Sequence, residues 1–185
     1  MRVLDLGCGP GTSLSSTGVS STDTITGVDI AFEDLRAAAP KFPARRFVLA
    51  RGEALPFRDH SFDRVVCQVA LPYMDIPSAL AEVSRVLVPG GLVHLSLHAF
   101  RFTLHEFTIA FPKPKALLFF FFLLANGIIL HTTGRPMNIK GRYESFQTVR
   151  GISLALRKAS FEKITMDRPP GRLPRFVVQA QKRTD

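Results

Sequence analysis

The feature that most constrains the fold is a regular alternation of short apolar strands and helices over the first half of the chain. Residues 3–6 form an apolar run that ends at a glycine, and runs with strand or helix spacing follow at short intervals. Strands are expected at 3–6, 24–29, 45–50, 62–70 and 92–98, helices at 32–39 and 76–89, and a weak, Ser- and Thr-rich helix at 11–21. This alternation predicts a parallel sheet with helices on both faces.

The pattern stops after residue 98 and returns near the C-terminus. Residues 99–142 are rich in Phe, Pro and Lys, whereas 145–159 has the spacing of an amphipathic helix. Residues 161–166 and 175–181 read as two closing strands joined by a turn-rich segment. We therefore expect a single domain over residues 1–185, with 99–142 as an apolar insertion.

Composition limits the class of protein. With 185 residues, 46% of them hydrophobic, the chain can bury a core, which excludes intrinsic disorder. The two cysteines, Cys8 and Cys67, fit neither a disulfide framework nor a metal-binding spacing, so no metal site is predicted. The N-terminus does not have the pattern of a signal peptide, and a reduced, cytoplasmic setting is the simplest interpretation.

The net charge of +9, from 24 Lys and Arg against 15 Asp and Glu, has two interpretations. One is a nucleic-acid or anionic-lipid partner. The other is a generally arginine-rich, solvated surface. Because the charges are scattered and form no tight run, the second interpretation is favoured.

The glycine-rich loop "DLGCGPG" after the first strand predicts a ligand site, because ligands of parallel sheets bind beyond the carboxyl ends of the strands. The next strand ends in Asp29, whose carboxylate can accept both hydroxyls of a ribose. The glycine spacing departs from the dinucleotide fingerprint, since Gly11 comes too early. Asp5, two residues before Gly7, suits an ammonium group better than a pyrophosphate. S-adenosylmethionine has the ribose and the ammonium and carries no phosphate.

With "VLDLGCGPG", "GVDIA" and "GEALPFRDHSFDRVVCQVALPYMDIPSALAEVSRVLVPGGLVHLSLH", the sequence resembles the class I S-adenosylmethionine-dependent methyltransferases. It looks like their small-molecule branch, which includes quinone-biosynthesis methyltransferases. The resemblance covers residues 2–98 and, more weakly, 143–181. It implies a Rossmann-like methyltransferase fold, with a seven-stranded, mostly parallel sheet, an antiparallel C-terminal hairpin strand and helices on both faces.

The resemblance also implies roles for residues in this chain. Asp5 is expected to hold the amino group of the cofactor, and Asp29 its ribose hydroxyls. Ile30 is expected to pack on the adenine, and Gln68 to lie on the sulfonium side. The remaining expected cofactor contacts come from two loops, the first-loop residues Gly7, Cys8, Gly9 and Gly11 and the backbone of Gly52 and Glu53.

Two positions depart from the family pattern. Relatives often have an Asp that binds the adenine amino group where this chain has Arg51, and arginine offers no acceptor. After the fourth strand, "ALPY" is similar to the Asn-Pro-Pro-Tyr motif of methyltransferases that act on the amines of bases, but the Asn is missing. A nucleic-acid substrate is therefore not expected. Tyr73 is either a residue of the substrate pocket or a packing aromatic.

A third departure is the start of the chain. Relatives usually carry helices before the first strand that cover the cofactor, whereas this sequence begins with the strand itself. We expect a truncated or misplaced start rather than an open site, since a central strand at the very N-terminus leaves little cover for the sheet.

Residues 117–130 form the most apolar stretch of the insertion and allow three interpretations. The stretch is shorter than the roughly 18–20 residues that span a bilayer as a helix. A lid over an apolar substrate pocket is favoured, because such pockets are lined by apolar and aromatic side chains. A segment that dips into a membrane surface, which would make the protein peripheral, and a buried core helix are the alternatives.

The expected function is methyl transfer from S-adenosylmethionine to a small, apolar molecule. A base is needed only for a hydroxyl acceptor, and the histidines His94, His98, His105 and His131 are candidates. His98 is the first choice because it ends the fifth strand on the ligand side, and Tyr73 is a further weak catalytic candidate. A cofactor-binding relic without turnover is the alternative, and an RNA methyltransferase is less favoured.

Overall fold

The computed structural model describes residues 1–12, 14, 17–20, 22–98, 114–139, 142–168 and 175–184. The strands are β1 (Arg2–Leu6), β2 (Thr24–Asp29), β3 (Arg46–Leu49), β4 (Phe62–Gln68), β5 (Leu87–His98), β6 (Phe161–Asp167) and β7 (Arg175–Lys182). The helices are α1 (Phe32–Ala38), the short η2 (Leu71–Tyr73), α2 (Ile76–Val86), α4 (Pro114–Thr133) and α5 (Val149–Lys158).

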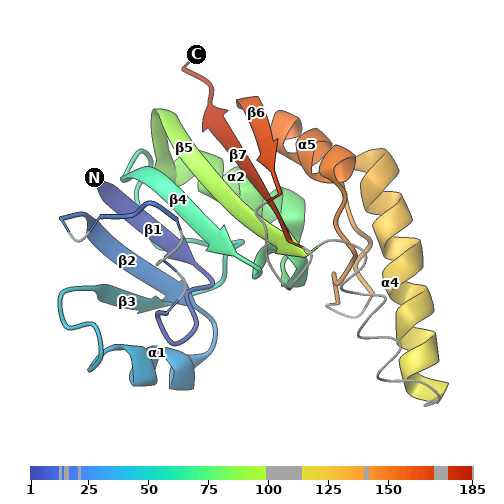
Figure 1. The fold of residues 1–185 in the computed structure, drawn as a ribbon, viewed down its shortest axis with the longest axis horizontal. Helices are drawn as coiled ribbons and strands as arrows, with labels where there is room; N and C mark the ends of the chain where they lie inside the picture. The colour runs from blue at the N-terminus through green and yellow to red at the C-terminus, as the bar shows by residue number, and fades with distance from the viewer. Residues whose placement is uncertain are drawn as a thin grey trace.

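The strands form one sheet in the order β3-β2-β1-β4-β5-β7-β6 (Figure 1). Neighbouring strands from β3 to β5 pair in parallel, whereas β7 runs antiparallel to both β5 and β6. The mostly parallel sheet with an antiparallel C-terminal strand is therefore confirmed. From β1 the chain passes to β2 and β3 on one side, and then returns from β3 to β4 on the other side of β1. The strand order therefore reverses at β1, and ligands of such sheets bind at this switch point.

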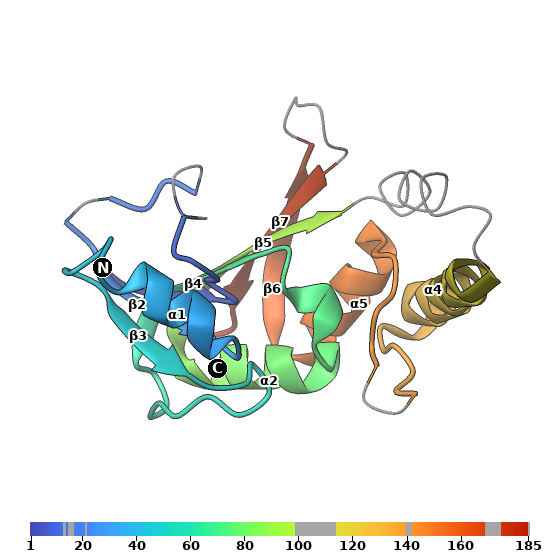
Figure 2. The same cartoon turned by 90° about the horizontal axis from the view of Figure 1, so that it is seen from below.

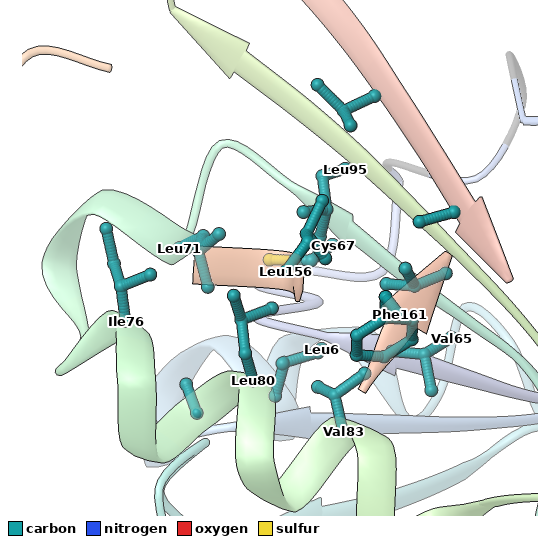
Figure 3. Packing of buried hydrophobic residues seen from close by; sticks show 14 of the residues in the cluster. Leu6, Val65, Cys67, Leu71, Ile76, Leu80, Val83, Leu95, Leu156 and Phe161 are labelled. Atoms are coloured by element: carbon teal, nitrogen blue, oxygen red, sulfur yellow. The ribbon is translucent and has the colours of Figure 1, made fainter. Parts of the chain in front are cut away.

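One face of the sheet carries the main core, which α2 and α5 cover. Leu4 and Leu6 of β1 point to the same side as Val65 and Cys67, their register partners in β4. Figure 3 shows Leu6, Val65 and Cys67 on the side of apolar residues of α2 such as Leu80, which is fully buried. Truncating a leucine in such a core costs about 2–5 kcal/mol, so this layer fixes the strands whose ends form the site.

The opposite face has a smaller apolar cluster made of Val3, Leu14, Ile25 and Val66, with Val19 packed against it. Polar groups share this face, since His94 is the register partner of Val66 and is only 8% exposed. In the part of the chain that the structure describes, neither the Nδ1 atom of His94 nor the Nε atom of Arg64 has a hydrogen-bond partner.

Two expected helices have different limits in the structure, and a third is only partly described. The helix expected over 76–89 ends at Val86, because the residue before Pro89 disfavours helical backbone, and β5 begins at Leu87 beside Phe62. The helix expected from residue 145 begins at Val149, since the Thr148 side chain caps it by accepting from the Gly151 amide. In the segment 11–21, Leu14 lies in a turn of 3-10 type and its carbonyl accepts from the Thr17 amide and hydroxyl, and the expected helix falls partly outside the described residues.

The helix α4 extends well beyond the apolar stretch and lies at the end of the molecule farthest from β3 and α1 (Figures 1 and 2). It packs beside α5, where the Gly151 backbone lies so close to the Leu130 carbonyl that a Cβ would come within 2.6 Å of it. The helix runs without a break through Asn126 and Gly127. Within the described residues, no helix is both long and apolar enough to cross a membrane.

Candidate functional site

A cavity of about 360 Å³ lies at the carboxyl ends of β1, β2 and β4, where the switch point predicts a ligand. Its walls come from the loops that follow these strands and β3. The lining residues are Leu6, Gly7, Val28, Asp29, Ile30, Ala50, Arg51, Gly52, Glu53, Gln68, Val69, Ala70, Tyr73 and Met74. Six of the expected cofactor residues are brought together here: Gly7, Asp29, Ile30, Gly52, Glu53 and Gln68.

The first loop is held against β2 by its backbone. The amides of Gly7 and Cys8 both donate to the Val28 carbonyl, at 2.8 and 3.1 Å. Gly7 has φ +71°, and a Cβ on it would lie 2.1 Å from the Cβ of Ala70. Only glycine therefore allows the loop to turn this close to the segment after β4.

Gly9 and Gly11, two further expected residues of this loop, do not line the cavity and instead stabilise the conformation of the loop. Gly9 has φ +50° and nothing near its missing Cβ, and its amide donates to Asp29 Oδ2 at 2.8 Å. Gly11 packs under Phe42, and its carbonyl accepts from Arg45 at 2.7 Å. These contacts brace the loop that carries Gly7.

Asp29 is the residue best placed to meet a ligand. Its Oδ1 accepts from the Ala31 amide at 2.9 Å, and its Oδ2 accepts from Gly9, so the carboxylate is fixed in orientation at the end of β2. A carboxylate offers about four acceptor positions, which leaves capacity for two further donors from the cavity. Ile30 beside it is 66% exposed and lines the same wall.

Asp5 and Cys8 are buried beside the cavity and do not line it. Asp5 is 1% exposed, at the register position opposite Gly27 and Val66. Burial and the carboxylates of Asp5 and Asp29 raise the pKa of the Cys8 thiol to about 12, and burial raises the pKa of Cys67 to about 12. Both thiols therefore stay protonated near neutral pH and are not nucleophiles.

The loop after β3 supplies the opposite wall. A Cβ on Gly52 would lie 2.6 Å from the Sδ of Met74, so this glycine lets the two loops meet. Glu53 joins the same pair of loops, because its Oε1 accepts from the Asp75 amide at 3.0 Å. Arg51 is exposed at the rim, with a guanidinium nitrogen 3.4 Å from Glu53.

The segment after β4 has a backbone feature that the sequence does not show. Val69 has φ +65°, a strained backbone for a β-branched residue, and its amide donates to the Ser96 carbonyl at 2.8 Å. Such strain persists where the surrounding structure imposes it, often at functional sites. Met74 lines the cavity and was not expected there from the sequence, although a glycine at position 52 is a signal that a bulky side chain packs against it.

Tyr73 and the candidate histidines have different surroundings. Tyr73 lines the cavity and is 66% exposed, which places it at the rim. His94 lies within the sheet, and burial together with the Arg64 charge lowers its pKa. The ring of His131 lies 2.9 Å from the Thr148 hydroxyl, at the α4–α5 junction. His105 and the side chain of His98 lie outside the described residues.

A second cavity, of about 410 Å³, adjoins the first. It is lined by Asp75, Arg135, Pro136, Met137, Asn138, Ile139 and Tyr143. The segment 73–75 separates the two cavities, because Tyr73 and Met74 line the first and Asp75 lines the second. Most of the second cavity therefore belongs to the segment that follows α4.

Asn126 of α4 fixes this segment. Its side chain is fully buried, and its Nδ2 lies 3.1–3.2 Å from the carbonyls of Met137, Tyr143 and Glu144. Its Oδ1 accepts from the Met137 amide at 2.5 Å. The backbones of Met137, Tyr143 and Glu144 are therefore hydrogen-bonded to one buried side chain, and Ile139 and Arg142 exchange two backbone bonds. Asn138 adds a bond to the Tyr143 hydroxyl at 2.8 Å.

Comparison with known proteins identifies the class. Residues 4–95 match the family model described as a methyltransferase domain, and this part of the chain is a methyltransferase domain. The chain is 40% identical over 99 residues to a demethylmenaquinone methyltransferase of Staphylococcus aureus. The aligned region covers 50% of this chain and 41% of that protein. The chain thus spans about two fifths of the length of this relative.

Solved structures share the fold at lower identity. An S-adenosylmethionine-dependent methyltransferase from Methanosarcina mazei superposes with a TM-score of 0.65 at 23% identity, over 100% of this chain and 93% of that one. A [4+2]-cyclase superposes with a TM-score of 0.69 at 16% identity, over 100% of this chain and 76% of that one. The resemblance to the S-adenosylmethionine-dependent methyltransferases is confirmed, and the cyclase shows that the fold also serves other chemistry.

S-adenosylmethionine is the cofactor that the family implies, and the cavity suits it. Two carboxylates, Asp29 and Glu53, line the wall against one cation, Arg51, a balance that favours a cationic sulfonium over a phosphate. At Gly7 and Gly52 the backbone itself forms the wall. Among the described residues, no group of three His, Cys, Asp or Glu side chains gathers to hold a metal ion.

Proposed function

We propose that the protein transfers the methyl group of S-adenosylmethionine to a small molecule with an apolar body. The observation that carries the proposal is the pair of adjoining cavities. The first has the residues expected for the cofactor, and the second, which begins at Asp75, offers space for the body of an acceptor whose reacting atom would enter the first cavity. Pro136, Met137 and Ile139 form the apolar part of the second cavity, and its other lining residues are polar or charged.

The expected chemistry needs alignment more than a catalytic side chain. The cofactor supplies an already activated methyl group, so the protein has to hold an acceptor in line with it, and such alignment supplies much of the rate. Gln68 and Tyr73 stand on the side from which an acceptor would approach. No described histidine side chain lines either cavity, which favours an acceptor that is already nucleophilic, such as a stabilised carbanion or a thiolate.

His98 stays a candidate base because it ends β5 at the same edge of the sheet. We propose testing it with His98→Ala. Methyl transfer that is unchanged across the pH range would remove His98 from the mechanism.

The insertion 99–142 is proposed to act as a substrate lid. Its described part supports this role, since 135–139 forms a wall of the second cavity and Asn126 holds that wall in place. The lid interpretation thus rests on the loop after α4, because no described residue of α4 lines the first cavity and the helix lies at the end of the molecule away from β2 and α1 (Figure 2).

The test is transfer of an isotope-labelled methyl group to a panel of small molecules that differ in apolar surface and in acceptor atom, read by mass spectrometry. The matched variants are Asp29→Ala, which removes the proposed ribose contact, and Asp34→Ala, which removes an equal charge from the exposed side of α1. Product formed by the natural chain and Asp34→Ala, and lost with Asp29→Ala, is the expected result. Failure with every acceptor class would contradict the proposal.

A cofactor-binding protein without methyl transfer is the alternative. Arg51, which stands where relatives often place an acceptor for the adenine, favours it. Cofactor binding without product from any acceptor would establish this alternative. RNA is a less favoured acceptor, because only the net charge of +9 points to it, and binding that falls steeply with salt would mark that charge as generic.

A peripheral position at the cytoplasmic side of a membrane is part of the proposal. An acceptor with a large apolar body partitions into lipid, and residues 117–130 form the most apolar surface segment of the chain. An enzyme whose acceptor is dissolved in the bilayer meets that acceptor more often when the enzyme itself is bound to the bilayer surface.

A further inference from the structure

The outward side of α4 carries a continuous apolar stripe. Leu118, Phe121, Ala125 and Ile128 follow one another at alternating intervals of three and four residues, which places them on one side of the helix. All four are exposed, and Leu118, Phe121 and Ile128 expose 75%, 58% and 59% of their surface. We refer to these four residues as the α4 stripe.

The opposite side of α4 is the side that packs on the protein. Asn126, Gly127 and Leu130 are buried there, and the Gly127 backbone lies against the ring of Phe146. The α4 stripe therefore faces away from α5, at the outer end of the molecule (Figures 1 and 2). A surface helix of a globular protein normally turns polar or charged side chains outward, whereas α4 is apolar on its outward side as well as on its inward side.

The charge around α4 has one sign. Residues 107–143 contain five Lys and Arg residues and no Asp or Glu. Lys115 stands exposed at the start of the helix, and Arg135 and Arg142 stand exposed after its end. The Arg142 guanidinium lies 5.6 Å from the centre of the Phe119 ring, and Phe119, seven residues before Asn126, stands on the packing side of α4 and not in the stripe.

An apolar stripe flanked by cations and free of carboxylates is complementary to an anionic lipid surface. Apolar side chains enter the boundary between headgroups and acyl chains, while Lys and Arg meet the lipid phosphates. Since no described helix has the length and hydropathy of a membrane span, the helix would lie on the bilayer instead of crossing it.

We propose that the α4 stripe docks the protein on an anionic bilayer, with the exposed cations near the two ends of the helix, Lys115 and Arg135, reaching the headgroups. Docking itself is independent of methyl transfer, and only its role in bringing the enzyme to an apolar acceptor rests on the proposed function. Docking would bring the second cavity to the lipid surface, because the loop that lines this cavity follows α4 directly.

The test is co-sedimentation of the full chain with vesicles of neutral lipid alone and with vesicles that contain about one third anionic lipid. We expect binding to the anionic vesicles that weakens as salt is added. Leu118→Ser with Phe121→Ser should weaken it at least about tenfold, since two buried apolar groups are lost. Leu49→Ser, which changes an exposed leucine of β3, is the matched control and should bind as the natural chain does.

A second pair of variants tests the cations. Lys115→Gln and Arg135→Gln should each weaken binding to anionic vesicles about fivefold and leave binding to neutral vesicles unchanged. Equal binding by the stripe variants and the natural chain would overturn the proposal. So would an absence of vesicle binding, in particular if the natural chain is a dimer that Phe121→Ser converts to a monomer. Methyl transfer is not needed for any of these readouts, so this inference and the proposed function fail separately.

Discussion

The cofactor end of the molecule and the α4 end are built under different constraints. Around the first cavity, backbone geometry decides the residue, because Gly7 and Gly52 sit where any side chain would collide with a neighbouring loop. Around the second cavity, one buried side chain, Asn126, holds a loop whose own side chains are largely exposed. The comparison teaches that a site made of backbone leaves a clear mark in the sequence, whereas a site held by one distant side chain does not.

The largest effect is expected from breaking the cofactor end at Gly7. Gly7→Ala places a Cβ 2.1 Å from the Cβ of Ala70 in a left-handed backbone, so cofactor binding should fall at least about 100-fold. The measurement is calorimetric titration with S-adenosylmethionine. Adding Ala70→Gly should restore part of the binding, because it removes the colliding atom. Gly9→Ala, where the space is open, should cost much less.

The next effect separates the two ends. Asn126→Leu leaves the Met137 amide and three carbonyls without their partner, and such a loss costs about 2–4 kcal/mol. Hydrogen exchange should show residues 137–144 opening, while cofactor affinity stays within about twofold of the natural value. Asn138→Ala, which removes one exposed hydrogen bond, is the control. Equal loss of cofactor binding would mean that the two ends are one structural unit.

A smaller effect sharpens the cofactor end. Arg51→Asp introduces an acceptor where relatives often have one, so affinity for S-adenosylmethionine should rise about 3–10-fold. Arg58→Asp makes the same charge change at an exposed residue outside the cavity and should alter affinity by less than about twofold. If both variants tighten binding equally, net charge explains the gain.

The smallest effect concerns the sheet that both ends share. The pKa of His94 is lowered in the folded state by burial and by Arg64, so the unfolded chain binds this proton more tightly. Stability from this group is full above its ordinary pKa, near 6.5, and is lost as the pH falls toward the lowered value. His94→Gln should flatten thermal stability between about pH 6.5 and 5, above the range in which the carboxylates titrate. An unchanged slope would show that His94 carries no such linkage.

The cofactor end was predictable because its chemistry restricts residue types at fixed spacing. Gly7, Asp29 and Gln68 were expected at the carboxyl ends of their strands and lie there around one cavity. The seven-stranded, mostly parallel sheet was predictable from the pattern of strands and helices together with the family resemblance, whereas the order of its strands comes from the structure. The part played by Asp5 stays a prediction, because the carboxylate is buried next to the cavity and does not line it.

The remainder depended on contacts between residues far apart in the chain. The sequence shows Asn126 and Gly127 as an interruption of an apolar run, whereas the structure uses them to hold residues 137–144 and to admit Phe146. The strained backbone of Val69 has no sequence signal either, because its cause is the bond to Ser96 in the next strand. Local propensity does not contain such non-local partners.

The central claim is that the first cavity binds S-adenosylmethionine through Asp29. Calorimetric titration of the natural chain with S-adenosylmethionine and S-adenosylhomocysteine, beside Asp29→Ala and the charge-matched Asp34→Ala, tests it most directly. We predict micromolar binding by the natural chain and by Asp34→Ala, and a loss of at least about 30-fold with Asp29→Ala, since the proposed bonds to the ribose hydroxyls disappear together with the bond from the Gly9 amide that braces the loop. Absent binding by the natural chain, or equal binding by Asp29→Ala, would contradict the account.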